Sequence, residues 1–256
     1  MTNRLHSQTN CPIRDFAVDL PEGRIAARRI DPPGGAPPDA PALVFLHEAL
    51  GCVAMWKNVP ERLVAMTGLP ALVYDRHGHG LSAPLVRARE PDYLEIEALD
   101  VLPRLLAECG IADPIPLGHS DGGSIALLYA SRHPVRALVS EAAHVFNEEV
   151  SRQGIREALV AWRETDLPQR LGRYHGEKTE ALFFAWADCW LSEEFAAFPE
   201  LYRPLTEDRN RAWVVQLVDL LDDRDDYLVV VGALHLVGRN SVVDLLRQRG
   251  YSVTQH

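Results

Sequence analysis

Lysine is nearly absent from this chain of 256 residues, which contains only Lys57 and Lys178. Arginine therefore supplies almost all of the positive charge, and an excess of acidic residues gives a formal net charge of -10. A chain this acidic is repelled by phosphate-rich polymers and by anionic membrane surfaces. We therefore expect neither nucleic acid nor a membrane among its main partners.

Closely spaced cysteines and long apolar runs are also missing. The four cysteines are far apart and form no CxxC pair: Cys11, Cys52, Cys109 and Cys189. This spacing argues against a metal site or a disulfide framework and favours free thiols in a reducing compartment. The polar N-terminus lacks the apolar stretch of a signal peptide, and no apolar run approaches the length of a membrane span. We expect a cytoplasmic protein that has no metal or other cofactor.

Strand-like and helix-like segments alternate through the first half of the chain. Hydrophobic residues make up 47% of the sequence, which is enough for a large folded core. Strands are predicted at 16–20, 24–30, 42–46, 71–74, 115–117 and 136–140, and helices at 55–66, 95–108 and 124–130. The first two strands form a predicted hairpin, and the later alternation is typical of an α/β fold with a mostly parallel central sheet flanked by helices. We expect a single domain over residues 1–256.

A serine lies in the turn between the predicted strand at 115–117 and the helix after it. The turn reads Gly118-His119-Ser120-Asp121-Gly122, the Gly-x-Ser-x-Gly form of a nucleophile elbow. In such an elbow, glycines on both sides of the serine let the strand and the helix approach closely, and the serine stands at the top of the sheet. The strand–turn–helix context favours this interpretation over a simple Gly/Ser loop.

Other polar residues also follow strand ends. His47, Asp75, Ser120 and Glu141 each come just past a predicted strand, and functional residues of parallel sheets gather beyond these ends. We therefore expect the four loops to form one site. Residues 145–195 then change character, with helical patterns and dense aromatic residues, and we interpret them as a helical lid over an apolar pocket. Simple packing of helices against each other is the alternative.

The last part of the chain has its own pattern. Helices are predicted at 207–221 and 237–249, with Gly250 as a C-terminal cap, and strands at 227–231 and 251–254.

Residues from about 14 to 195 resemble the α/β-hydrolase family. The resemblance is carried by His47-Glu48-Ala49-Leu50-Gly51, by Asp75-x-x-Gly78-x-Gly80-x-Ser82 and by the serine turn described above. It implies a serine hydrolase, with Ser120 as nucleophile and the backbone N–H groups of Ala49 and Asp121 as the oxyanion hole. Such donors contribute about 3–4 kcal/mol each to transition-state stabilisation.

The C-terminal segment, residues 196–256, instead resembles the TraB/GumN family. The resemblance is carried by Arg209-Asn210, by the stretch from Val230 to Gly238 and by the stretch from Leu245 to Tyr251. That family has been suggested to be metalloprotease-like, with two separated Gly-x-x-His motifs. Only the second motif is present here, from Gly232 to His235.

A nucleophilic serine needs a base and a group that orients this base. In the α/β-hydrolase family an acid and then a histidine follow the serine along the chain. The last part of this sequence does not contain that pattern in its usual form. His235, at a Gly-flanked turn after a predicted strand, is the first candidate for the base, and His256 and His144 come after it. Glu141 is the candidate acid, because some hydrolases take their acid from the strand after the elbow. A structural role for His235 and a lid-hinge role for Glu141 are the alternatives.

Three functions remain open from the sequence. The first is a carboxylesterase-like serine hydrolase that cleaves an ester, a thioester or a C–C bond of a small apolar molecule. The second is a hydrolase-like protein whose triad is incomplete, and the third is a metal-dependent protein of the TraB/GumN type. In the first case we expect a monomer or a homodimer whose partner is a small-molecule substrate.

Overall fold

The chain divides into two compact units, Met1–Ala196 and Ala197–His256. The computed structural model describes residues 10–37, 39–144, 147, 149–193, 195, 209–221 and 240–253. The division falls next to the join between the two family resemblances in the sequence.

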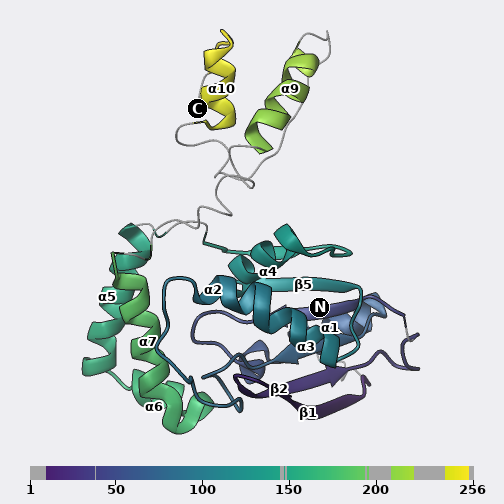
Figure 1. Ribbon diagram of the computed structural model, residues 1–256, viewed down its shortest axis with the longest axis vertical. Helices are drawn as coiled ribbons and strands as arrows, with labels where there is room; N and C mark the ends of the chain where they lie inside the picture. The colour runs from purple at the N-terminus through teal and green to yellow at the C-terminus, as the bar shows by residue number, and fades with distance from the viewer. Residues whose placement is uncertain are drawn as a thin grey trace, which may run out of the picture. The chain divides into compact units, whose positions relative to one another are not determined.

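A central sheet forms the middle of the first unit (Figure 1). Among the described residues it has six strands, in the spatial order β1 (Ile13–Leu20), β2 (Gly23–Ile30), β4 (Ala71–Tyr74), β3 (Ala42–Leu46), β5 (Pro114–His119) and β6 (Val139–Glu141). β1 and β2 pair as an antiparallel hairpin, β2 is antiparallel to β4, and the remaining neighbours are parallel. The predicted hairpin and the mostly parallel sheet are confirmed.

The two middle strands, β3 and β4, are buried along their whole length. Their sequences are continuously apolar because helices cover both faces of a parallel sheet. β3 lies between β4 and β5, with Leu46 paired to Gly118 near the carboxyl ends of the strands. The loops that follow β3, β4 and β5 therefore meet at one edge of the sheet.

The predicted helix at 55–66 is divided in two. A short 3-10 helix, η1 (Val53–Trp56), precedes α1 (Val59–Thr67). Lys57, between them, has a φ of 53°, which a continuous right-handed helix does not allow. The prediction of one helix was therefore wrong at its start.

The predicted helix at 95–108 is a helical stretch with a change of winding. It contains α2 (Tyr93–Ile96), the π-helical segment η2 (Glu97–Val101) and α3 (Leu102–Glu108). Pro103 has no N–H with which to continue the regular hydrogen-bond ladder, so the winding changes just before it. The elbow is followed by α4 (Asp121–Arg132), as predicted.

The predicted lid region is helical in its described parts. It consists of α5 (Glu149–Glu164), α6 (Leu167–His175), the 3-10 turn η3 (Gly176–Lys178) and α7 (Thr179–Leu191). Trp162 of α5 stacks on Phe183 of α7 with 4.2 Å between ring centroids. These aromatic side chains therefore pack the helices of the predicted lid against each other. Such packing was the alternative interpretation of the many aromatic residues in this region.

Two polar side chains of the predicted lid bond to the loops after β3 and β4. Lys178 donates hydrogen bonds to the carbonyls of His79 (3.2 Å) and Gly80 (2.7 Å), in the turn after β4. His175 accepts a hydrogen bond from the Gly80 N–H (3.0 Å), and its other ring nitrogen lies 2.9 Å from the Leu50 carbonyl. The position of the lid therefore depends on the same loops that surround the elbow.

In the second unit, the described residues form α9 (Arg209–Leu221) and α10 (Val242–Gln248). The Ser241 hydroxyl caps α10 by accepting a hydrogen bond from the Asp244 N–H, and Gly250 follows the helix with a φ of 89°. Residues 251–253 form no strand, so the strand predicted at 251–254 was wrong in its described part. The strand predicted at 227–231 lies outside the described residues.

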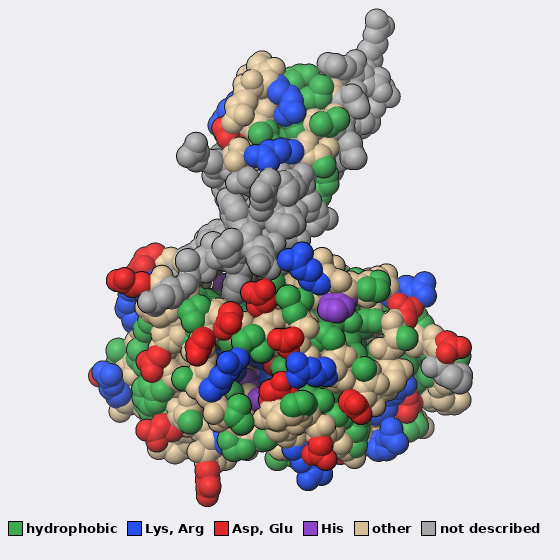
Figure 2. Space-filling model, in the orientation of Figure 1, with side chains coloured by type: hydrophobic (Ala, Val, Ile, Leu, Met, Phe, Trp, Pro, Cys, Tyr) green, Lys and Arg blue, Asp and Glu red, His purple; other side chains and the backbone are tan. Residues whose placement is uncertain are grey.

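Acidic and basic side chains are interspersed on the face of the first unit that Figure 2 shows. Charge of one sign is not gathered into a large patch there. Of the helices in the described part of the chain, none combines the length and the apolar character needed to cross a membrane.

Candidate active site

The turn that carries Ser120 has the backbone of a nucleophile elbow. Ser120 has φ 53° and ψ -117°, a strained combination for a residue that is not glycine. A Cβ atom on Gly118 would lie 2.0 Å from the Gly122 carbonyl oxygen, and one on Gly122 would lie 1.9 Å from the Leu46 carbonyl oxygen. Both glycines are therefore required by close backbone approach. The Ser120 N–H donates to the Glu141 carbonyl (2.9 Å), which ties the turn to β6.

A histidine lies beside the Ser120 hydroxyl. His144 Nε2 is 3.4 Å from Ser120 Oγ, and the ring packs edge-on against Trp190 with 5.0 Å between centroids. Ser124, one turn along α4, holds the backbone of this histidine. Its hydroxyl donates to the His144 carbonyl (2.7 Å) and accepts from the His144 N–H (2.9 Å).

The two predicted oxyanion donors, Ala49 and Asp121, lie with Ser120 on one cavity. It has a volume of about 200 Å³. Its walls come from the elbow, the loop after β3 and the lid helices: Ala49, Ser120, Asp121, His144, Ser151, Gly154, Ile155, Trp186 and Trp190. The lid aromatics thus divide into those that hold the helices together and those that line the cavity. The cavity supports the prediction of an apolar pocket under a lid.

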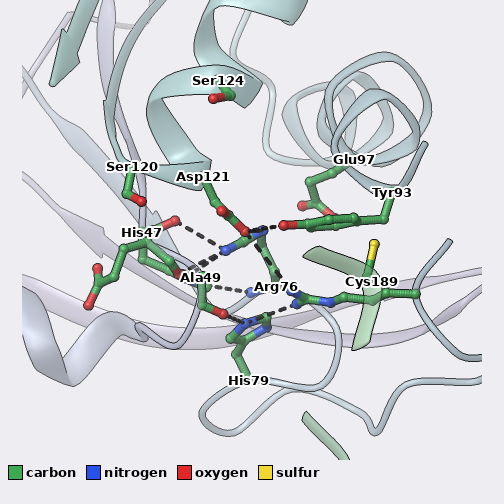
Figure 3. Close-up of polar contacts among 12 residues, drawn as sticks. His47, Ala49, Arg76, His79, Tyr93, Glu97, Ser120, Asp121, Ser124 and Cys189 are labelled. Atoms are coloured by element: carbon green, nitrogen blue, oxygen red, sulfur yellow. Dashed lines mark hydrogen bonds and ion pairs between the residues drawn. The ribbon is translucent and has the colours of Figure 1, made fainter. Parts of the chain in front are cut away.

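The carboxylate of Asp121 is buried beneath the elbow among cationic and phenolic groups (Figure 3). It accepts a hydrogen bond from the Tyr93 hydroxyl (2.6 Å) and lies 3.6 Å from Arg76 Nη1 and 4.0 Å from Arg89 Nη1. The side chain of Asp121 is 0% exposed, and those of the arginines are 3% and 5% exposed. Burial and the neighbouring carboxylate raise the pKa of Tyr93, which stays a phenol and a hydrogen-bond donor.

Asp75 supports the turn after β4 and does not lie on the cavity. Its carboxylate accepts hydrogen bonds from the N–H groups of Val53 (2.7 Å) and Leu81 (2.8 Å). A Cβ on Gly80, which has a φ of 43°, would lie 2.1 Å from the same carboxylate. The Asp-x-x-Gly-x-Gly-x-Ser motif therefore shapes this loop, and the structure gives Asp75 a structural role in the predicted site.

One buried histidine, His47, begins the loop after β3, residues 47–51, and two more, His79 and His175, contact this loop. The pKa values of His47 and His79 are lowered strongly by burial and by nearby cations, Arg76 for His47 and the two buried arginines for His79. Burial also lowers the pKa of His175. His47 accepts the Arg76 N–H at Nε2 (3.1 Å), and its Nδ1 lies 2.8 Å from the Glu48 carbonyl, so these partners assign the proton to Nδ1. All three rings are neutral near pH 7.

Of the residues predicted as candidates to complete the triad, Glu141 and His144 lie in the described part of the chain. Glu141 is exposed, and its carboxylate makes no hydrogen bond or ion pair with another described residue. Its backbone carbonyl holds the elbow, as described above. His235 and His256 lie outside the described residues. The assignment of Glu141 and His235 to the triad stays a prediction.

The buried cluster under the elbow was not predicted from the sequence. Arg76, Arg89 and Tyr93 were not singled out, because arginine and tyrosine are common on surfaces and their sequence positions are far from Asp121. One signal was available. Asp121 follows the serine at a position that begins a buried helix, and a buried carboxylate requires a partner.

Comparisons with known proteins support the fold. The chain is 30% identical over 173 residues to a 2-succinyl-6-hydroxy-2,4-cyclohexadiene-1-carboxylate synthase of Enterobacter sp. (strain 638), and the match covers 65% of this chain. It is 27% identical over 141 residues, 54% of the chain, to the sn-1-specific diacylglycerol lipase ABHD11 of Mus musculus. The chain spans 58% of the length of the first relative and 44% of the second.

A solved structure shows the same architecture. It comes from work on carboxylesterases of the thaumarchaeon Nitrososphaera gargenis, with a TM-score of 0.57 and 18% identity, and the match covers 74% of this chain and 75% of that one. The chain has the α/β-hydrolase fold. Residues 132–255 also match the TraB/PrgY/gumN family. This match begins before the lid, and not at about residue 196 as the sequence motifs indicated.

Proposed function

We propose that the protein is a serine hydrolase that cleaves an ester, a thioester or a C–C bond of a small apolar substrate. The single observation that carries this proposal is the geometry around Ser120. The strained elbow presents its hydroxyl to a cavity that is also lined by Ala49, Asp121 and His144. A nucleophile, a ring nitrogen and two oxyanion donors in one cavity are the parts that acyl transfer requires.

His144 is the base that the described geometry favours. In an ester substrate, Ser120 Oγ attacks the carbonyl carbon, its proton passes to His144 Nε2, and the carbonyl oxygen becomes an oxyanion beside the N–H groups of Ala49 and Asp121. Loss of the alcohol, which takes the proton, leaves an acyl-enzyme that water hydrolyses by the same route. The distance of 3.4 Å is at the long end for a hydrogen bond, as catalytic contacts are in many proteins without substrate.

The size and the walls of the cavity favour a substrate with a small acyl or aryl group. Its volume of about 200 Å³ is comparable to cavities that hold benzene-sized molecules, and Ile155, Trp186 and Trp190 give it apolar walls. The two curated relatives act on different substrates, and each is matched over only part of its length. The substrate class therefore rests on the cavity and not on these names.

The proposal is tested by covalent labelling. A fluorophosphonate reacts with activated serines: Oγ displaces fluoride at phosphorus, and the proton leaves through the base. Intact mass and peptide mapping of the labelled protein should locate one adduct, on Ser120. Folded protein that takes up no label would contradict the proposal and favour a hydrolase-like protein that has lost activity.

Replacement of the base should slow acylation strongly. We expect His144→Ala to reduce the labelling rate by about 10³-fold, because Ser120 loses its proton acceptor. His235→Ala, made in parallel, separates the two candidates. If only His235→Ala produces this loss, the base is His235 and the assignment of His144 is wrong.

A glycine in the lid offers a test of the acyl cavity. Gly154 of α5 lines the cavity, and a Cβ there would meet no atom within 4 Å. Gly154→Leu should fill the cavity, so we expect kcat/KM for p-nitrophenyl hexanoate to fall at least tenfold relative to the acetate ester, since each excluded methylene costs about 1 kcal/mol.

The matched control is Gly172→Leu in α6. Gly172 is also helical, and a Cβ there has Thr179 Oγ1 as its nearest neighbour at 3.9 Å, away from the cavity residues. This variant should leave the ratio of hexanoate to acetate unchanged. An equal change in both variants would mean that the lid was distorted and that the cavity does not hold the acyl chain.

A further inference from the structure

Arg76 holds the peptide group that carries the first oxyanion donor. Its Nη2 donates to the Glu48 carbonyl at 2.8 Å and to the His47 carbonyl at 3.2 Å. His47 Nδ1 lies 2.8 Å from the same Glu48 carbonyl and adds a second donor. The Gly51 N–H also donates to the Glu48 carbonyl (3.0 Å), so three donors hold this carbonyl, and Arg76 is the cationic one.

Together these contacts fix the direction of the Ala49 N–H. The Glu48 carbonyl and the Ala49 N–H belong to one planar trans peptide group, so they point in opposite directions. Since the carbonyl points to Arg76, the N–H points away from it, and Ala49 lies on the cavity that contains Ser120. A charge-assisted hydrogen bond to the carbonyl also polarises the peptide group and strengthens its N–H as a donor.

The same guanidinium also reaches the second donor. Arg76 Nη1 lies 3.6 Å from the carboxylate of Asp121, whose own backbone N–H is the other predicted oxyanion donor (Figure 3). One side chain, 3% exposed, therefore connects the loop after β3 to the first residue of α4. Arg89 is the second arginine beside the Asp121 carboxylate. It makes no hydrogen bond to the carbonyls of residues 47–49 within the described chain.

We infer that Arg76 is a positioning residue that aligns the two halves of the oxyanion hole, the Ala49 N–H through the Glu48 carbonyl and the Asp121 N–H through the Asp121 carboxylate. This inference rests on the proposed function, because an oxyanion hole has a purpose only if Ser120 attacks a carbonyl group. Arg76 itself touches no reacting atom. Its effect belongs to the transition state, where the oxyanion exists, and not to the bound substrate.

The test compares Arg76→Met with Arg89→Met, which removes a buried arginine beside the same carboxylate. The substrate is p-nitrophenyl butyrate. The transition-state analogue is an alkyl trifluoromethyl ketone, whose carbonyl carbon bonds to Ser120 Oγ while the serine proton moves to the base and the carbonyl oxygen becomes an oxyanion. We expect Arg76→Met to lower kcat and the affinity for the ketone in parallel, by about 10- to 100-fold, less than the 10²–10³ lost on deleting a donor. KM should change less than about threefold.

Arg89→Met should lower the ketone affinity by no more than about threefold. Equal losses in the two variants, or a loss that falls on KM alone, would overturn the inference, since either result describes general destabilisation. If Arg76→Met does not fold, Arg76→Lys replaces it. A lysine keeps the charge near Asp121 but not the planar fork, and an intermediate loss of kcat is expected.

A second measurement separates this inference from the proposed function. A wild-type protein that does not react with the ester or the ketone contradicts the proposed function, and the NMR amide resonance of Ala49 then decides the role of Arg76. We expect this resonance to shift much more in Arg76→Met than in Arg89→Met. Equal shifts would overturn the inference, whether or not the protein is active.

Discussion

Ser120→Ala should abolish turnover of p-nitrophenyl esters, with a loss in kcat of about 10⁵- to 10⁶-fold, and should also prevent labelling by a fluorophosphonate. The reason is that no other nucleophile replaces a serine hydroxyl in acyl transfer, so only the residual effect of the oxyanion hole and of binding remains. The measurement is steady-state hydrolysis together with intact mass after labelling. Activity retained in Ser120→Ala would show that a different residue is acylated.

Ser131→Ala is the matched control for this variant. Ser131 is on the same helix, α4, and its hydroxyl donates to the Leu128 carbonyl (2.7 Å) one turn earlier. Its removal should leave the esterase rate unchanged within about a factor of two. A similar loss in both variants would indicate damage to the helix and not removal of the nucleophile.

Ser120→Gly adds a measurement of the strain in the elbow. A φ of 53° with ψ of -117° is costly for any residue with a Cβ, by about 1–3 kcal/mol, and is readily adopted by glycine. Part of this gain is offset by the greater freedom of glycine in the unfolded chain. We therefore expect the free energy of unfolding of Ser120→Gly to exceed that of Ser120→Ala by about 1 kcal/mol, with both variants inactive.

Acid should destabilise the first unit steeply below about pH 6.5. His47, His79 and His175 are 1%, 0% and 2% exposed, and their pKa values in the folded state are lowered. Their stabilising contribution is fully present above the unfolded pKa of about 6.5. It is lost as the pH falls from there toward the folded pKa values, because the unfolded chain then binds protons that the folded chain does not.

The expected size follows from this linkage. Each such histidine contributes a slope of up to about 1.4 kcal/mol per pH unit, so three contribute up to about 4 kcal/mol per unit. This is a large part of the 5–15 kcal/mol that stabilises an ordinary domain. Urea unfolding followed by near-UV circular dichroism, between pH 7.5 and 5.5, measures the slope.

Two variants test whether the buried histidine rings cause this dependence of the free energy of unfolding on pH. His175→Gln keeps an acceptor and a donor for the Gly80 N–H and the Leu50 carbonyl but does not titrate, so the slope should fall, by at most about one third because the pKa of His47 and that of His79 are lowered more strongly. His119→Gln is the matched control, because the side chain of His119 is 42% exposed. A slope that is unchanged in His175→Gln would show that other groups cause the acid sensitivity.

The elbow could be predicted from the sequence because its determinants are local. Gly118, Ser120 and Gly122 lie within one turn, and the apolar strand before them and the helix after them can be read from neighbouring residues. The continuously apolar segments of β3 and β4 predicted buried parallel strands for the same reason. Errors arose where a single backbone feature overrode the pattern, as at Lys57 in the predicted helix at 55–66.

The partners of the elbow could not be predicted in the same way. Asp121 and Tyr93 are 28 positions apart, and Gly80 and His175 are 95 positions apart, yet each pair forms a hydrogen bond. No local pattern specifies such pairs, because they depend on how strands and helices pack. His144 was a lesser candidate for the base, and only the path of the chain after β6 brings its ring to Ser120.

The sequence by itself determined the kind of sheet and the turn that carries Ser120, both of which follow from short-range backbone geometry, whereas the two backbone donors were expected from the family resemblance. The tertiary structure decided what surrounds them: the histidine at the serine hydroxyl, the lid aromatics on the cavity, and the buried pairing of Arg76 with Asp121. The physical reason is that burial changes what a charged or aromatic side chain does. A lone arginine in a sequence has no assigned partner, whereas an arginine enclosed beneath an elbow must bind the carbonyls and the carboxylate that it meets there.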